Sequence, residues 1–145
     1  MSMQTLYVYN QFLNLISNEE INFNNDEFKV MLVSSAYTPN INSHKYKSDI
    51  IGESTGVGYN AGGLALNNVR YTVDGNIATF SADNPKWEEL DIDNVRYIVL
   101  YDNTPSEDTS KPLLCYIDLG DTLNILNAEL EVIWNINGII RFTIR

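Results

Sequence analysis

Histidine-based chemistry in this chain depends on one residue, because His44 is its only histidine. A catalytic triad, a general-base pair or a zinc site would each have to use it. Zinc also needs further His or Cys ligands, and the only cysteine, Cys115, lies far away in the apolar stretch LLCYIDL. We therefore expect no metal and no cofactor. His44 is interpreted as a hydrogen-bonded loop histidine and Cys115 as a buried structural thiol.

The segment GESTGVGYNAGG, residues 52–63, is rich in glycine. A phosphate-binding loop of the Walker type would need a Lys followed by Ser or Thr, and a dinucleotide-binding loop would need a preceding strand and a following helix. The segment has neither pattern and contains no cation. Its glycines, including Gly58, Gly62 and Gly63, are therefore interpreted as positions of positive φ or of close backbone packing.

Nineteen Asp and Glu residues supply many pairs that resemble the acid and base of a glycosidase. Asp49 with Glu53 is one example and Glu88 with Asp91 is another, but so acidic a chain produces such pairs by chance. The segment EELDID is interpreted more simply as a solvated turn. Calcium could bind oxygen ligands in DID or DNTPSED, although neither matches the twelve-residue calcium loop. No catalytic residue is predicted, and we do not expect an enzyme.

The nine basic residues leave a formal net charge of -10 at pH 7. This charge repels duplex DNA, RNA and anionic membranes, so we expect neither a nucleic acid nor a membrane as a partner. Its simplest role is solubility, and attraction to a basic partner surface is the alternative. Residues 1–20 contain no basic leader and no uninterrupted apolar core, so they predict neither a signal peptide nor a membrane span.

The elements that would position these residues begin with a short amphipathic segment. We expect a single domain over residues 1–145, which is long enough to bury a core. Apolar side chains recur every three or four residues and predict a helix over about 6–17, although LYVY could also start as a strand. Residues 28–35 are strand-like. Residues 36–68 form a long glycine-containing loop, and loops of this length usually make contacts or carry function.

Most of the remaining chain is strand-like. A hairpin is predicted around Asp74-Gly75, and Asn137-Gly138 marks a second one between the last two strands. DNPKWEELDID is interpreted as a polar bridge anchored by Trp87. The other predicted strands are 95–101, 113–119, 130–134 and 139–145. The pattern predicts a mainly β fold, an antiparallel β-sandwich or partly closed barrel of about seven strands with one N-terminal helix and a long ordered loop.

Aromatic residues in the long loop are candidates for contact with a partner. Tyr37, Tyr46 and Tyr59 lie in irregular backbone, and Tyr is frequent at interfaces. Together with Trp87 they could form a platform on which a sugar stacks. Core and edge packing explains most of the other tyrosines.

Three groups of motifs carry a resemblance to a known family. They are Tyr37-Thr38-Pro39-Asn40 with His44 and Ser48-Asp49-Ile50, the Gly56-x-Gly58-Tyr59-x-x-Gly62-Gly63 loop, and Tyr101-Asp102 followed by Tyr116-Ile117-Asp118-Leu119-Gly120. In this order they resemble a family of short tailed-bacteriophage structural, or virion, proteins of unknown function. The likeness runs from about residue 6 to residue 142. It carries over no catalytic residue.

The resemblance implies a non-enzymatic virion structural protein that is assembled in the host cytoplasm and present in multiple copies. Its partners would be other virion proteins, namely capsid, connector or tail subunits, bound on the capsid or head-tail region. The alternative is a carbohydrate- or receptor-binding β-sandwich module of a phage tail or fibre. In either case we expect the long loop to contact the partner through Tyr37, Pro39, His44, Tyr46, Asp49, Gly58, Tyr59, Gly62 and Gly63.

Overall fold

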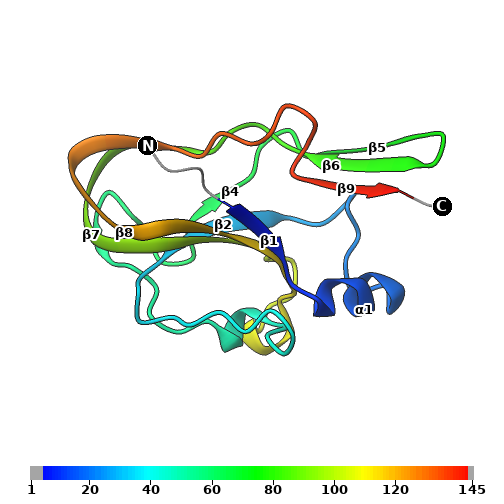
Figure 1. Ribbon diagram of the computed structural model, residues 1–145, viewed down its shortest axis with the longest axis horizontal. Coiled ribbons are helices and arrows are strands. Elements are labelled where there is room, and N and C mark those ends of the chain that lie inside the picture. The colour runs from blue at the N-terminus through cyan, green and yellow to red at the C-terminus, as the bar shows by residue number, and fades with distance from the viewer. Residues whose placement is uncertain (1–4, 144–145) are drawn as a thin grey trace.

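The computed structural model describes residues 5–143 of the chain (Figure 1). It is mainly β, with 48% strand and 9% helix. The first elements are β1 (Thr5–Val8), α1 (Gln11–Ser17), β2 (Phe28–Val33), the 3-10 helix η1 (Lys47–Asp49), β3 (Gly56–Val57) and β4 (Leu64–Ala65). They are followed by β5 (Arg70–Asp74), β6 (Ile77–Ser81), β7 (Lys86–Asp102), the 3-10 helix η2 (Asp108–Ser110), β8 (Leu113–Glu131) and β9 (Ile140–Thr143).

The strands form two separate sheets. The larger sheet has the order β1-β8-β7-β2-β4, and β3 pairs with the outer part of β7. The smaller sheet has the order β5-β6-β9. All strand pairs are antiparallel, and neither sheet closes on itself. The mainly β, sandwich-like prediction is therefore confirmed, and the barrel alternative is wrong.

The larger sheet is covered on both faces, as β2 shows. Its sequence FKVMLV is apolar without alternation, the pattern of a strand whose two faces are both buried. Phe28, Val30 and Leu32 face a core shared with α1 and the smaller sheet. Met31 and Val33 face a second core, to which the long loop contributes. Figure 1 shows the smaller sheet on one side of the larger sheet and the first part of the long loop, drawn in cyan, on the other.

The long loop thus covers part of the larger sheet, and only part of the loop is irregular. Residues 36–68 contain η1 and the two short strands β3 and β4. These strands attach the loop to the larger sheet, because Gly56 and Val57 pair with β7, and Leu64 and Ala65 pair with β2. The loop therefore supplies the second layer that an amphipathic or doubly apolar sheet requires.

The predicted N-terminal helix begins too early. Residues 5–8 form β1 and pair with β8, and α1 starts only at Gln11. The pairing satisfies the backbone groups of Tyr7 and Val8, whose aromatic and β-branched side chains favour a strand. Phe12 and Leu15 are the buried residues of α1.

The predicted strands 95–101 and 113–119 and most of the polar bridge belong to one long hairpin. Of the predicted strand 130–134, only residues 130–131 are in β8, and the rest lies in the connection to β9. EELDID is part of β7 and not a solvated turn, and β8 runs continuously from 113 to 131. Register shifts interrupt the pairing, and Asn94 and Asn127 have positive φ beside them. These bends interrupt the regular alternation by which a strand is recognised in a sequence. Polar residues that face water on the outer parts of the hairpin obscure the pattern further.

Of the two predicted hairpins, only the first forms. The turn after Asp74 joins β5 to β6, as expected. The Asn137-Gly138 hairpin is wrong, because β9 pairs with β6 and not with β8. Gly138 instead closes a turn in which its N–H donates to the carbonyl of Asn135 at 2.9 Å. The last two residues of the predicted strand 139–145 lie outside the described part of the chain.

Candidate functional site

The connection between β8 and β9, residues 132–139, stands between two grooves and is called the ridge here. Its side chains alternate between the interior and water. Val132 and Trp134 are buried, whereas Ile133 is 73% exposed and Ile136 is 99% exposed. An isoleucine exposed to this degree contributes nothing to the core, so it is available to a partner.

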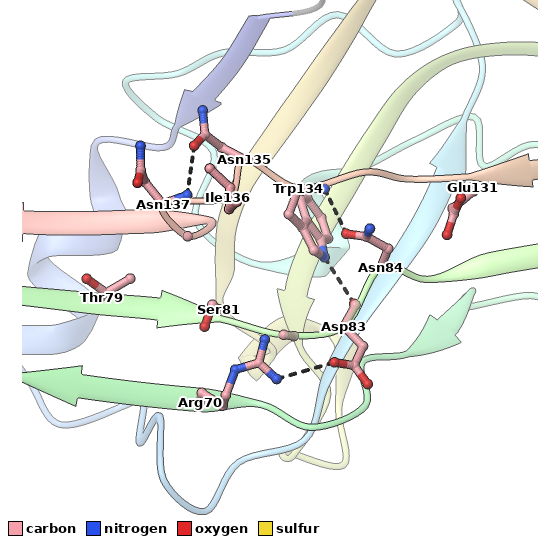
Figure 2. A pocket seen from close by; sticks show the side chains of 12 residues that line it. Arg70, Thr79, Ser81, Asp83, Asn84, Glu131, Trp134, Asn135, Ile136 and Asn137 are labelled. Carbon is pink, nitrogen blue, oxygen red and sulfur yellow. Dashed lines mark hydrogen bonds and ion pairs between the residues drawn. The ribbon is translucent and has the colours of Figure 1, made fainter.

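Hydrogen bonds hold the ridge in place. The backbone N–H of Trp134 donates to Asn84 Oδ1 at 2.9 Å, and its indole Nε1–H donates to the carbonyl of Asp83 at 3.2 Å (Figure 2). The N–H of Ile139 donates to the carbonyl of Phe80 at 2.8 Å. The ridge is therefore anchored to β6 and to the segment that follows it.

The groove between the ridge and the larger sheet is apolar. It has a volume of about 920 Å³. Glu131 and Arg141 are its charged residues. This apolar groove is lined by Leu6, Ile98, Ile117, Leu119, Leu123, Leu130, Glu131, Val132, Ile133, Trp134, Asn135, Asn137, Gly138, Ile139 and Arg141.

The groove on the other side of the ridge is polar and has a volume of about 720 Å³ (Figure 2). Hydrogen bonds from Asn68 and from Arg70, which lies 3.3 Å from Asp83 Oδ1, hold the pKa of the Asp83 carboxyl below its usual range. Asn135 Oδ1 accepts from the backbone of Asn137 at 2.9 Å. This polar groove is lined by Arg70, Thr79, Ser81, Ala82, Asp83, Asn84, Glu131, Trp134, Asn135, Ile136, Asn137 and Gly138.

The residues predicted from the long loop are divided between the two faces of the larger sheet, and some are buried. Tyr37, Tyr59 and Trp87 belong to the two cores, because their rings fill the space on either side of the sheet. The sugar-stacking platform predicted from them is therefore not present on the surface. Tyr46 remains half-buried, and its hydroxyl donates to Glu20 Oε1 at 2.7 Å.

A chain of hydrogen bonds links two buried tyrosines to His44. The N–H of Asn40 donates to His44 Nδ1 at 3.2 Å, so this nitrogen is an acceptor and the imidazole carries its proton on Nε2. The Tyr37 hydroxyl then donates to Nδ1 at 2.7 Å, and the Tyr9 hydroxyl donates to Tyr37 at 2.9 Å. Burial raises the pKa of Tyr37 to about 12. His44 is thus a hydrogen-bonded loop histidine, as predicted.

Glu53 organises the glycine-rich segment. Its Oε2 accepts from the Tyr59 hydroxyl at 2.6 Å and from the N–H of Gly62 at 2.7 Å. Tyr59 in turn accepts from the N–H of Leu32 at 3.0 Å, and the Tyr101 hydroxyl donates to the carbonyl of Gly62 at 2.6 Å. Burial, followed by the bond to Glu53, raises the pKa of Tyr59. These bonds tie the loop to β2 and β7.

Close packing explains the glycines, as predicted. A Cβ on Gly63 would lie 1.7 Å from the carbonyl oxygen of Val30, and one on Gly58 would lie 2.1 Å from that of Glu89. Both glycines also have positive φ, at +86°. The segment therefore approaches two strands more closely than any side chain allows.

The predicted carboxylate pairs serve the local backbone. Asp49 Oδ2 accepts from the N–H groups of Lys45 and Tyr46 at 2.8 and 3.1 Å, and Glu53 is used as described above. Glu88 lies 3.8 Å from the ammonium of Lys86 on the same strand. Within residues 5–143, no group of three or more His, Cys, Asp and Glu side chains is placed to hold a metal ion. Pro39 is half-buried in the loop.

A buried carboxyl group is the feature that sequence patterns missed. Asp102, at the end of β7, is 0% exposed, and its Oδ2 has no hydrogen-bond partner among residues 5–143. Its Oδ1 accepts from the N–H of Thr104 at 3.0 Å. Burial and the neighbouring Asp26 carboxyl raise the pKa of Asp102 to about 7. The segment DNTP shows only a turn, since Asp26 lies far away in the sequence.

The two grooves were missed for the same reason, because they combine distant strands. The only local signal was the pair of isoleucines set among polar residues in WNINGII. Cys115 is buried as predicted, and burial raises the pKa of its thiol. No helix between residues 5 and 143 combines the length and apolar character needed to cross a bilayer.

No family model, curated protein or solved structure matches the chain. What the geometry offers is a β-sandwich-like domain with an apolar and a polar groove on either side of an exposed ridge.

Proposed function

We propose that the chain is a non-enzymatic structural protein of a bacteriophage particle. It assembles in the host cytoplasm and joins capsid, connector or tail subunits in multiple copies on the capsid or head-tail region. The observation that carries the proposal is the apolar groove, one wall of which carries the exposed Ile133 of the ridge. Contiguous exposed apolar surface of this kind is typical of protein–protein contact sites.

Two further features support a structural role. The loop carboxylates and His44 are engaged in hydrogen bonds that fix the fold, so they offer no facing acid and base. Strands β1 and β9 are sheet edges, and an exposed edge can accept a strand from another subunit. The resemblance of its motifs to those of short phage virion proteins is the reason for proposing a phage particle.

Antibody labelling of purified particles of the phage that encodes the chain tests the proposal. A regular pattern of label on intact particles is the expected result, and its position distinguishes head, connector and tail. An unlabelled particle, with the protein present only in the lysate, would contradict the structural role. Particles that carry an epitope tag on an unrelated capsid protein provide the labelling control.

The polar groove favours a second candidate, a carbohydrate- or receptor-binding module of a tail or fibre. Its amides and the Arg70–Asp83 pair match the polar contacts by which hydroxyl groups are recognised (Figure 2). Binding to an array of cell-wall glycans tests this function. Asn137→Ala should remove binding, whereas Asn60→Ala, on the opposite loop, should not.

A further inference from the structure

The apolar groove and the ridge are adjacent, because residues of the ridge form one wall of the groove. The ridge presents Ile133 and Ile136 to water, at 73% and 99% exposure. The groove beside it has the ridge as one wall, which includes Ile133, and Leu and Ile side chains of β1, β7 and β8 as the other. Ile136 lies at the polar side of the ridge. A surface that holds both a projecting apolar ridge and an apolar recess can pair with itself about a two-fold axis, because each copy then supplies both elements.

The distribution of charge selects a second copy as the occupant. Two copies that each carry a net charge of -10 repel one another over most of their surfaces. The apolar groove contains one acid, Glu131, and one base, Arg141, so this patch is neutral. Neither residue forms an ion pair within residues 5–143.

A two-fold contact also pairs these two charges between the copies. Glu131 lies at the end of β8 and Arg141 lies on β9, on either side of the ridge. When the ridge of each copy enters the groove of the other, the carboxylate of one copy meets the guanidinium of its partner. The contact then has two equivalent ion pairs at the rim of an apolar centre, the usual anatomy of an interface.

We propose that residues 132–139 of one copy bind in the apolar groove of a second copy, so that the chain forms a two-fold dimer. The proposal rests on the structural role proposed above, which it deepens by naming a subunit contact. The unpaired edges of β1 and β9 border the same groove and offer backbone hydrogen bonds to the incoming ridge.

Solution mass, measured by light scattering over a range of protein concentrations, tests the contact. The wild-type chain should change from monomer to dimer as its concentration rises. Ile136→Asp should weaken the dimer at least tenfold, since it places a charge in an apolar recess. Folding should survive this change because Ile136 makes no core contact. Ile51→Asp is the matched control, because Ile51 is also an exposed isoleucine, at 62%, but lies in the loop on the opposite face.

Charge reversal tests the orientation of the two copies. Arg141→Glu should weaken the dimer, because it sets two carboxylates against each other across the axis. Combining it with Glu131→Arg should restore the dimer. A double variant that stays as weak as the single one would overturn the two-fold arrangement.

The outcomes separate this inference from the proposed function. A wild-type chain that remains monomeric at about 1 mM overturns the self-contact, even where antibody labels the particle. Loss of particle labelling in Ile136→Asp with no change in solution mass also overturns it, because the groove then holds a different protein. A dimer sensitive to Ile136→Asp supports the contact, and its absence from particles would contradict only the structural role.

Discussion

Replacing Asp102 with Asn should make the protein more stable at neutral pH and leave its stability nearly unchanged in acid. Asn has the shape of Asp and keeps an oxygen that can accept from Thr104. Its amide can donate to the Asp26 carboxylate, so the variant replaces repulsion with a hydrogen bond. The buried Oδ2 that has no partner in the wild type is removed at the same time.

The magnitude follows from the pKa of Asp102. The folded chain holds it at about 7, compared with an ordinary value of 3.8. As the pH rises, the unfolded chain releases this proton first, so the free energy of unfolding of the wild type falls between about pH 4 and pH 7 and is level above. A shift of about 3 units corresponds to about 4 kcal/mol, and relaxation around the charge lowers the expected gain in Asp102→Asn to about 2 kcal/mol at pH 8.

Urea unfolding of both proteins at several pH values measures this difference directly. The stability of Asp102→Asn relative to the wild type should increase with pH up to about pH 7. Asp108→Asn is the control, because its stability relative to the wild type should change with pH in the opposite direction. Burial raises the pKa of Asp108, but Lys47 and Lys111 outweigh it and lower the pKa, so this variant should lose relative stability as pH rises. An Asp102→Asn variant that is less stable than the wild type by the same amount at pH 4 and pH 8 would refute the reasoning.

Three further predictions concern the cover and the core. Gly63→Ala should cost at least about 3 kcal/mol, because its Cβ would collide with the carbonyl oxygen of Val30, and a thermal unfolding curve that matches the wild type would contradict this packing. Tyr59→Phe should cost about 1–3 kcal/mol in urea unfolding, since Glu53 loses a buried donor; an unchanged midpoint would show that water replaces the hydroxyl. Cys115 should react with a maleimide only as fast as the protein opens, because its thiol is buried, and complete labelling of the folded protein within seconds would show otherwise.

The sequence predicted the fold best where the pattern is local. The apolar run of β2, interrupted only by Lys29, and the Asp74-Gly75 turn each determine their own structure, and both predictions hold. The outer half of the long hairpin was missed because its strands are bent and one face meets water, so EELDID looks like a turn. The strand alternative for LYVY, and not the preferred helix, is correct for β1, because the same apolar residues fit a helix as well as a strand.

The candidate site was less predictable because it depends on distant pairings. Nothing near Asn137-Gly138 indicates that β9 pairs with β6, and this pairing creates both grooves. The loop tyrosines Tyr37 and Tyr59 were predicted to contact a partner, but both are buried. Their burial arises from sheet faces that the sequence alone did not show as covered. Asp26 and Asp102 likewise meet only after β2 and β7 have paired.

The pairing of β9 with β6 also sets the order in which the chain folds. The hairpins β5–β6 and β7–β8 join strands that are neighbours in the sequence, whereas β9 reaches β6 only across the whole β7–β8 hairpin. Non-local pairing is slow because the closure entropy of the intervening chain must be overcome first. Docking of β9 should therefore be the last and slowest step of folding. Trp134, fixed to Asp83 and Asn84 on the connection that leads to β9, is the fluorophore placed to report that step.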